Sequence, residues 1–137
     1  MINIDLLKKE LMRDEGVELK VYEDSLGIKT IGVGRNIEDV GITSAEAQHL
    51  LGNDLIRVFQ ELDSVKPFWR DLSNEQQRAL ANMSFNMGLP RLLGFKKMWA
   101  HLEAGHFFAA SREALDSRWA DQVGDRAKRM ALLLETN

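Results

Sequence analysis

The sequence predicts an α+β protein that is mostly helical, with a small β-hairpin lobe joined by a long helix to a helical C-terminal lobe. Apolar residues recur with helical spacing over most of the chain, and they alternate with polar residues only between positions 17 and 35. A length of 137 residues suits one domain. We therefore expect a single domain over residues 1–137. Residues 1–64 would hold the first helix, the hairpin and the connecting helix, and residues 65–137 the helical lobe.

The N-terminal part is expected to be a helix followed by the hairpin. Residues 4–14 are amphipathic, Asn3 is a suitable cap, and Gly16 is a stop signal. Strict alternation over residues 17–21 then predicts a strand. A turn of Asp, Ser, Leu and Gly leads into a second strand over residues 28–35.

Helix signals dominate the rest of the chain. Thr43 and Glu46 form a predicted capping box that opens a helix to about residue 64. Ser73 and Gln76 form a second predicted box, and the helix that it opens stops at a glycine. Shorter helices are expected near residues 95–104, 107–117 and 126–134.

Composition excludes several classes of protein. The 45% apolar and 28% charged residues are typical of a globular domain. The chain has no cysteine, which excludes a disulfide scaffold and a thiol nucleophile. A net charge of −3 disfavours a dedicated nucleic-acid binder. No apolar run approaches the ~20 residues of a membrane span, and the charged first residues are unlike a signal peptide.

Three polar residues are candidates for chemistry. Glu15 ends the first predicted helix, where the partial negative charge of the helix end favours the protonated form of a carboxyl group, as a general acid requires. Asp24 lies at the tip of the first strand, and Thr30 lies on the second strand, where its hydroxyl can orient a water. Two carboxylates in different environments and a water-positioning group are what glycoside hydrolysis requires.

Each of these residues also has a purely structural interpretation. An Asp at a hairpin turn is commonly a turn former, a Glu before a Gly is commonly an exposed helix end, and a strand Thr often has no special role. Spacing alone leaves both interpretations open.

Several separated motifs resemble those of the T-even phage lysozymes, the endolysins of glycoside hydrolase family 24. The family motif is a Glu, eight residues, an Asp, five residues and a Thr, and Glu15, Asp24 and Thr30 satisfy it. The resemblance extends in the same order over nearly the whole chain, through residues 14–16, 22–24, 27–34, 82–88, 94–95, 117–119 and 125–129.

The resemblance implies a lysozyme-like fold and a muramidase that cuts the β-1,4 bond between N-acetylmuramic acid and N-acetylglucosamine in peptidoglycan. Glu15 would act as the general acid, and Asp24 and Thr30 would hold the attacking water, with inversion at the anomeric carbon. Arg126 matches a family arginine that pairs with the acids of the first helix, so we expect it near Asp14 or Glu15. No metal or organic cofactor is implied.

Phe85 and Asn86 match positions that line the substrate cleft in the family, so both are expected to contact sugars, although Phe85 is equally well explained as a core residue. Trp69, Trp99 and Trp119 are better explained as core of the helical lobe. His49, His101 and His106 lack metal-ligand spacing with carboxylates.

The chain also departs from the family pattern. Arg35 stands where the family often has a His, so the ion pair of that His should be absent or altered. The segment between Gly34 and Thr43 is shorter than in well-known members, which implies fewer or weaker outer sugar subsites. Many phage lysozymes are basic, which this chain is not; a local basic patch could substitute, formed by Arg118, Arg126, Lys128 and Arg129.

The resemblance favours a phage endolysin that is made in the host cytoplasm and reaches the periplasm and cell wall during lysis with the help of a holin. We expect a monomer that binds peptidoglycan, with no nucleic-acid partner and no stable membrane association. Alternatives are a tail-associated muramidase, a catalytically weak peptidoglycan-binding module, and a small helical nucleic-acid-binding domain. A lytic transglycosylase product is a further alternative, which the water-holding Asp24 and Thr30 disfavour.

Overall fold

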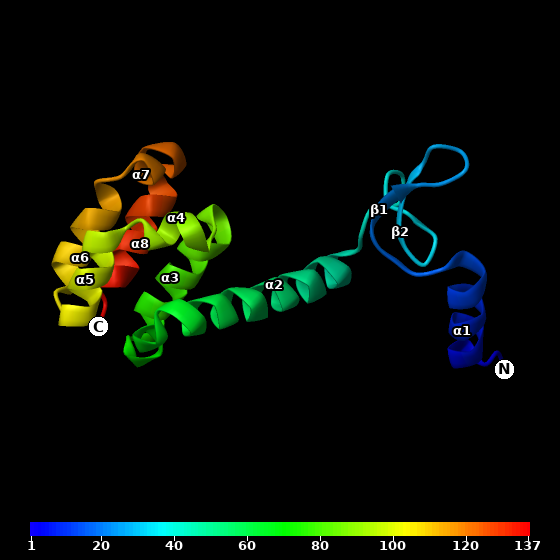
Figure 1. The fold of residues 1–137 in the computed structure, drawn as a ribbon, viewed down its shortest axis with the longest axis horizontal. Helices are drawn as coiled ribbons and strands as arrows, with labels where there is room; N and C mark the ends of the chain where they lie inside the picture. The colour runs from blue at the N-terminus through cyan, green and yellow to red at the C-terminus, as the bar shows by residue number, and fades with distance from the viewer. The chain divides into compact units, whose positions relative to one another are not determined.

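The computed structural model describes residues 1–137, and the predicted fold class is confirmed: the chain is mostly helical with one small antiparallel sheet (Figure 1). It divides into two compact units, Met1–His49 and Leu50–Asn137. Helix α2 (Ser44–Val65) contains the boundary between them. The expected organisation as a single lysozyme domain stays a prediction.

The first unit begins with helix α1 (Ile4–Glu15). The Asn3 side chain caps it as predicted, because its Oδ1 accepts a hydrogen bond from the Leu6 backbone N–H at 3.0 Å. Gly16 follows the helix with a φ of +77°, a conformation that favours glycine and stops the helix. Glu15 is therefore held at the carboxyl end of α1.

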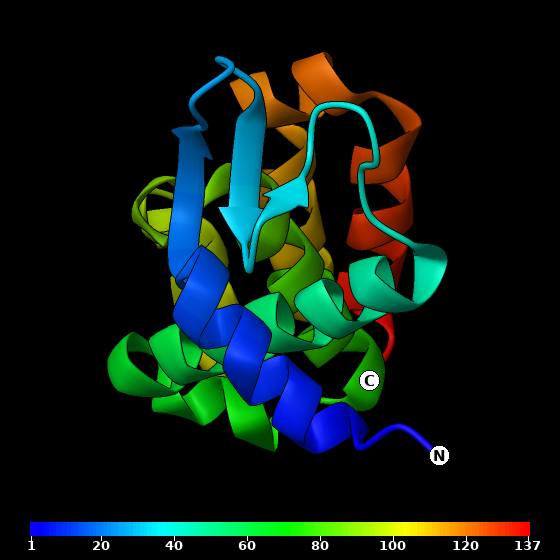
Figure 2. The same ribbon diagram turned by 90° about the vertical axis from the view of Figure 1, so that its right-hand side faces the viewer.

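A three-stranded antiparallel sheet follows, in the order β1 (Glu18–Glu23), β2 (Lys29–Gly32) and β3 (Arg35–Asn36) (Figure 2). The prediction of a single hairpin was incomplete, because the expected second strand does not continue to residue 35. The backbone turns after Gly32, where Gly32 and Gly34 have φ values of +71° and +64°, and the chain returns as β3.

Helix α2 starts with the predicted capping box. The Glu46 backbone N–H donates to Thr43 Oγ1 at 3.1 Å, and the Thr43 backbone N–H donates to Glu46 Oε1 at 2.8 Å. These two bonds satisfy amide groups that the first turn of the helix leaves without partners.

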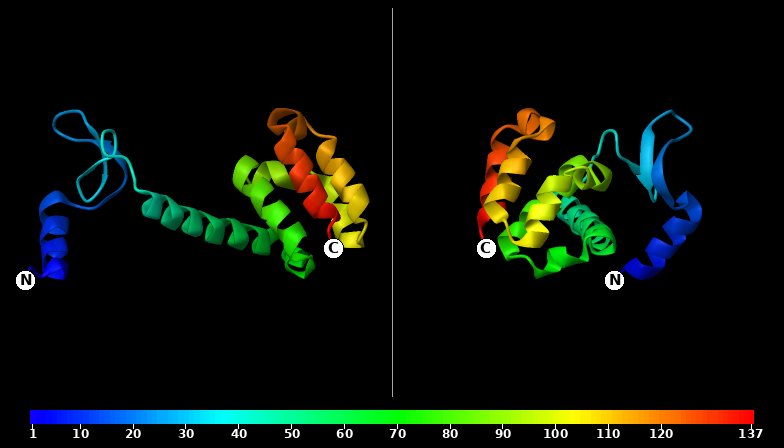
Figure 3. Two further views of the ribbon diagram at one scale, coloured as in Figure 1. Left: turned by 180° about the vertical axis from the view of Figure 1, so that it is seen from behind. Right: turned by 60° about the vertical axis from the view of Figure 1, so that its left-hand side comes forward.

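The second unit is entirely helical after α2. The capping box of Ser73 and Gln76 is confirmed at the start of α3. Three short helices were not predicted, namely η1, α4 and α7. Helix α4 contains Pro90 in its first turn, where proline is tolerated, and α7 is capped by Ser117. Helix α8 packs against α3 and α6 (Figure 3). The elements after α2 are η1 (Pro67–Asp71), α3 (Asn74–Met87), α4 (Leu89–Leu93), α5 (Lys96–Ala104), α6 (Phe107–Leu115), α7 (Arg118–Val123) and α8 (Asp125–Glu135).

The core of the second unit contains all three tryptophans, as predicted. Trp69, Trp99 and Trp119 are each at most 2% exposed. Gln76 is also fully buried, and its Nε2 donates to the Leu134 carbonyl at 2.9 Å, which ties α3 to α8. None of the helices combines the length and the apolar character that crossing a bilayer requires.

Candidate active site

Asp24 immediately follows β1 and uses one carboxylate oxygen to build the turn. Its Oδ1 accepts hydrogen bonds from the backbone N–H groups of Leu26 at 2.8 Å and Ile28 at 2.9 Å. The turn-former interpretation is therefore right for this oxygen. Asp24 Oδ2 makes no hydrogen bond within the protein, so it remains free to accept one from a water or a substrate.

Thr30 lies on β2, the central strand, and is 4% exposed. It is opposite Tyr22 on β1 and Asn36 on β3. Its hydroxyl donates to the Ile28 carbonyl at 2.9 Å. Because a hydroxyl has one hydrogen to donate, Thr30 Oγ1 can meet a further ligand only as an acceptor.

The backbone of Ile28 connects these two predicted site residues. Its N–H donates to the Asp24 carboxylate, and its carbonyl accepts from both the Asp24 N–H at 3.0 Å and the Thr30 hydroxyl. Asp24 and Thr30 therefore both hydrogen-bond to the backbone of Ile28, and these bonds fix both side chains.

Glu15, the predicted acid, is exposed at the end of α1. Its carboxyl group lies close to the turn between β2 and β3. A Cβ atom placed on Gly34 would be 3.0 Å from Glu15 Oε2 and 3.3 Å from its Cδ. Within the first unit, the acid is thus packed against the backbone of this turn.

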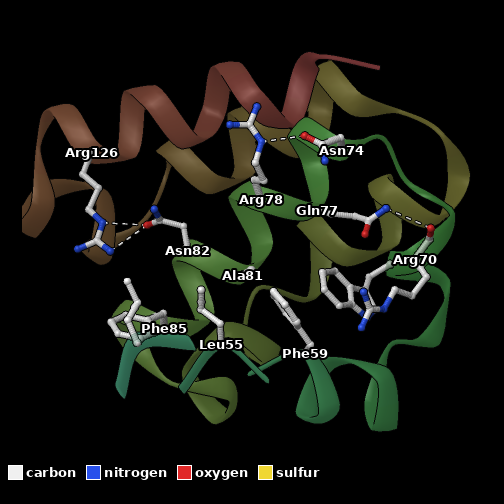
Figure 4. A pocket seen from close by; sticks show the side chains of 12 residues that line it. Leu55, Phe59, Arg70, Asn74, Gln77, Arg78, Ala81, Asn82, Phe85 and Arg126 are labelled. Atoms are coloured by element: carbon white, nitrogen blue, oxygen red, sulfur yellow. Dashed lines mark hydrogen bonds between the residues drawn. The ribbon is translucent and has the colours of Figure 1, made fainter. Parts of the chain in front are cut away.

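A hollow of about 470 Å³ lies in the second unit (Figure 4). Its apolar surface includes Phe59 and Phe85, and its polar surface carries Arg70, Arg78 and Arg126. No aspartate or glutamate lines it. Asp63 lies outside the lining and pairs with Arg70, so the uncompensated positive charge of the hollow comes from Arg78 and Arg126.

Each of the three arginines in the hollow is held by a neighbour. Arg70 forms a two-pronged ion pair with Asp63, at 2.8 Å and 3.1 Å. The hydrogen bond from Arg70, followed by one from the Trp69 indole, lowers the pKa of Asp63. Arg78 Nε donates to Asn74 Oδ1 at 3.0 Å, and no carboxylate pairs with Arg78.

Arg126 has a partner that the sequence did not indicate. Its Nε and Nη2 both donate to Asn82 Oδ1, at 3.0 Å and 2.9 Å (Figure 4). Asn82 lies within one of the motifs that carry the family resemblance, which was the only signal for it. The expected pairing of Arg126 with Asp14 or Glu15 stays a prediction.

The two predicted sugar-contact residues differ in their surroundings. Phe85 is 45% exposed and lines the hollow, which disfavours the core interpretation within this unit. Asn86 Oδ1 accepts a hydrogen bond from the buried Trp119 indole at 2.8 Å. The side-chain amide nitrogen of Asn86, Nδ2, makes no hydrogen bond within the protein and is free to donate.

Arg35, at the position where the resemblance led us to expect a histidine, forms an ion pair with Glu46. Its Nη1 donates to Glu46 Oε1 at 2.6 Å and to the Gly41 carbonyl at 3.2 Å. The hydrogen bond from Arg35, together with the one from the Thr43 backbone, lowers the pKa of Glu46 to about 2. This ion pair links β3 to the first turn of α2. His, Asp and Glu side chains form no group of three that would hold a metal ion.

The comparison with protein families decides the identity. A sequence model described as phage lysozyme matches residues 12–134. The chain belongs to the phage lysozyme family. This match covers most of both compact units and includes Glu15, Asp24 and Thr30.

Individual relatives agree with a lysozyme of the T4 type. The chain is 28% identical to a probable T4-type lysozyme of Dictyostelium discoideum over 97% of its own length and 95% of the relative. It is 36% identical to the endolysin of Salmonella phage P22 over 61% of its length and 62% of the relative. It is also 32% identical to the pre-baseplate central spike protein Gp5 of Enterobacteria phage T4, over 92% of its length. The lysozyme chain spans 27% of that spike protein.

Proposed function

We propose that this lysozyme hydrolyses the β-1,4 bond between N-acetylmuramic acid and N-acetylglucosamine in peptidoglycan. Glu15 would be the general acid, and Asp24 and Thr30 would hold the attacking water. The observation that carries the proposal is the shared attachment of Asp24 and Thr30 to Ile28, which leaves one free acceptor on each side chain.

The reaction needs one proton donated to the glycosidic oxygen and one proton removed from the attacking water. Glu15 donates its carboxyl proton to the glycosidic oxygen as the bond from that oxygen to the anomeric carbon breaks. A water attacks the anomeric carbon from the opposite face, and its proton passes to Asp24, so the configuration inverts. Glu15 ends as a carboxylate and Asp24 as a carboxylic acid, and proton exchange with solvent restores both.

The hydrogen bonds of Asp24 and Thr30 leave acceptors that can hold the attacking water. Asp24 Oδ2 and Thr30 Oγ1 are acceptors only, because Thr30 already donates its hydrogen to Ile28. A water that gives one hydrogen to each would keep a lone pair for the anomeric carbon. Pre-ordered side chains lower the entropic cost of placing that water.

The charge of the second unit supports an anionic substrate. The wall polymer carries carboxylates, and two arginines of the hollow, Arg78 and Arg126, have no carboxylate partner. Local attraction at this surface would offset the net charge of −3. Phe85 and the free side-chain amide Nδ2 of Asn86 would supply further contacts to sugars.

The test compares the wild-type chain with Glu15→Gln on purified peptidoglycan in water enriched in ¹⁸O. We expect the wild type to release reducing ends that carry the label, with the α configuration in the first product by NMR. Glu15→Gln should release none. Glu10→Gln is the matched control, because Glu10 is an exposed acid on the same helix with no ion-pair partner.

Other results would contradict the proposal. Unlabelled 1,6-anhydro ends would indicate a lytic transglycosylase, and a β product would exclude inversion. Sedimentation with peptidoglycan without any cleavage would indicate a binding module. Equal activity of Glu15→Gln and wild type would remove Glu15 from the mechanism.

For the biological role we propose an endolysin that is made in the host cytoplasm and cuts the wall once a holin has opened the way. The similarity to a central spike protein favours a second candidate, a muramidase carried in the phage particle. Mass spectrometry of purified particles and of the lysate separates the two. An endolysin should be abundant in the lysate and absent from particles, whereas a particle component should be found in both.

A further inference from the structure

We propose that Gly34 is a positioning residue for the Glu15 carboxyl group. Its missing side chain leaves the space in which that carboxyl lies, and a side chain at this position would displace it. The inference deepens the proposed function and depends on Glu15 being its general acid.

The shortest contact of a side chain at position 34 would be with Glu15 Oε2. A Cβ on Gly34 would stand 3.0 Å from Glu15 Oε2, 3.3 Å from Cδ and 3.4 Å from Cγ. These distances are shorter than normal contacts between such atoms, so one of the two groups must move. Glu15 is exposed and its side chain is flexible, whereas Gly34 lies in a tight turn between β2 and β3. The carboxyl group would therefore be the part that moves.

The position of Gly34 also resists substitution for a second reason, which has to be separated from the first. Its φ of +64° lies in the left-handed region, where a Cβ causes backbone strain. Gly32, two residues earlier at the end of β2, has a similar φ of +71°, and a Cβ there would meet no atom within 4 Å. The two glycines thus share the backbone strain and differ in their contact with Glu15.

The chemistry explains why a small displacement matters. A general acid acts on one oxygen of the substrate and must lie within hydrogen-bond reach of it in the transition state. A Cβ at these distances requires the carboxyl to move by a few tenths of an ångström. Since a misplacement of about 1 Å at a reacting group lowers the rate by about 10²-fold, this smaller shift should lower it by about three- to tenfold. The loss should fall on kcat, because Glu15 would protonate the leaving oxygen and would not supply most of the binding contacts.

The experiment compares Gly34→Ala with Gly32→Ala. We expect similar losses of thermal midpoint in both, because the backbone strain is similar. Gly34→Ala should lower kcat by about three- to tenfold with little change in KM, and Gly32→Ala should stay within about twofold of wild type. The Glu15 side-chain carboxyl ¹³C resonance, assigned with Glu15→Gln, should shift in Gly34→Ala and stay in place in Gly32→Ala.

Equal kcat values and equal Glu15 resonances in the two variants would overturn the proposal. If either alanine variant fails to fold, Gly34→Asn and Gly32→Asn replace the pair, because asparagine tolerates the left-handed region better and carries the same Cβ. If the wild type cuts no peptidoglycan, the proposed function fails. The ¹³C shift then decides by itself whether Gly34 positions the carboxyl.

Discussion

Arg35 Nη1 donates to Glu46 Oε1 at 2.6 Å, and the same oxygen accepts the Thr43 backbone N–H at 2.8 Å. One carboxylate oxygen thus joins strand β3 to the capping box of α2. Because a guanidinium keeps its charge throughout the physiological pH range, this link does not weaken near neutral pH as a histidine pair would.

The first prediction concerns Glu46→Gln and acid stability. The pKa of Glu46 is about 2 in the folded chain, below its ordinary 4.5, mainly because of the hydrogen bond from Arg35. A lowered pKa stabilises the folded state above pH 4.5, and this contribution is lost as the pH falls from 4.5 to about 2. Glu46→Gln should lower the thermal midpoint at pH 7 by a few degrees, and its difference from wild type should shrink across that range.

The control for this prediction is Glu38→Gln. Glu38 is exposed in the same unit and forms no ion pair. In Glu38→Gln the thermal midpoint should depend on pH in the same way as in the wild type. An unchanged difference between Glu46→Gln and wild type from pH 7 down to pH 2 would refute the role of the ion pair.

The second prediction is that Asp24→Asn separates catalysis from folding. The Asn Oδ1 can still accept from the Leu26 and Ile28 N–H groups, so the thermal midpoint should change little. The free acceptor that takes the proton of water would be lost, and kcat should fall by about 10²- to 10⁴-fold. The rate of reducing-end release measures the loss of catalysis, and a thermal melt measures the stability. A large loss of stability would mean that the charge itself holds the turn.

The third prediction tests Thr30 with a pair of substitutions. Thr30→Val keeps the shape and removes the hydroxyl, and Thr30→Ser keeps the hydroxyl. We expect Val to lower kcat by about 10- to 100-fold, because the water loses one fixed partner. Ser should retain most of the activity. The Ile28 carbonyl keeps its bond from the Asp24 N–H in both variants, so thermal melts should differ little. Equal activity of the two variants would count against a water-holding hydroxyl.

The fourth prediction concerns the core of the helical unit. Leu134 is fully buried on α8, and Leu132 on the same helix is 65% exposed. Leu134→Ala should lower the free energy of unfolding by about 2–5 kcal/mol, because it leaves a cavity. Leu132→Ala should change it by less than about 0.5 kcal/mol. Urea unfolding followed by circular dichroism measures both. Similar losses in the two variants would mean that the packing of α8 differs from that described.

Local signals predicted the helix starts well, because a capping residue and its target amide are only a few positions apart. Asn3 and the two capping boxes were predicted for that reason and are confirmed. The predicted second strand is longer than β2, since the alternation of residues continues through two glycines whose conformation the sequence does not reveal. Helix α4 is not among the predicted elements, and Pro90 lies in its first turn, where proline is tolerated.

The candidate site was predicted from its motif, but its supporting contacts were not. The spacing of Glu15, Asp24 and Thr30 gave no sign that Ile28 would hold two of them. The closeness of Gly34 to Glu15 depends on how a helix end meets a turn 19 positions later, which local patterns do not encode. The bond from Arg126 to Asn82 is likewise a tertiary contact.

Asp24 divides its work between its two oxygen atoms, one tied into the turn and one free. Under the proposed mechanism, replacing the free oxygen of Asp24 by an amide nitrogen would be enough to abolish catalysis and would leave the turn in place. Under the same mechanism, a lysozyme-like chain that binds the wall without cutting it would need no change of fold. The residue at this one position is the first that should be compared when an enzyme is to be told from a look-alike.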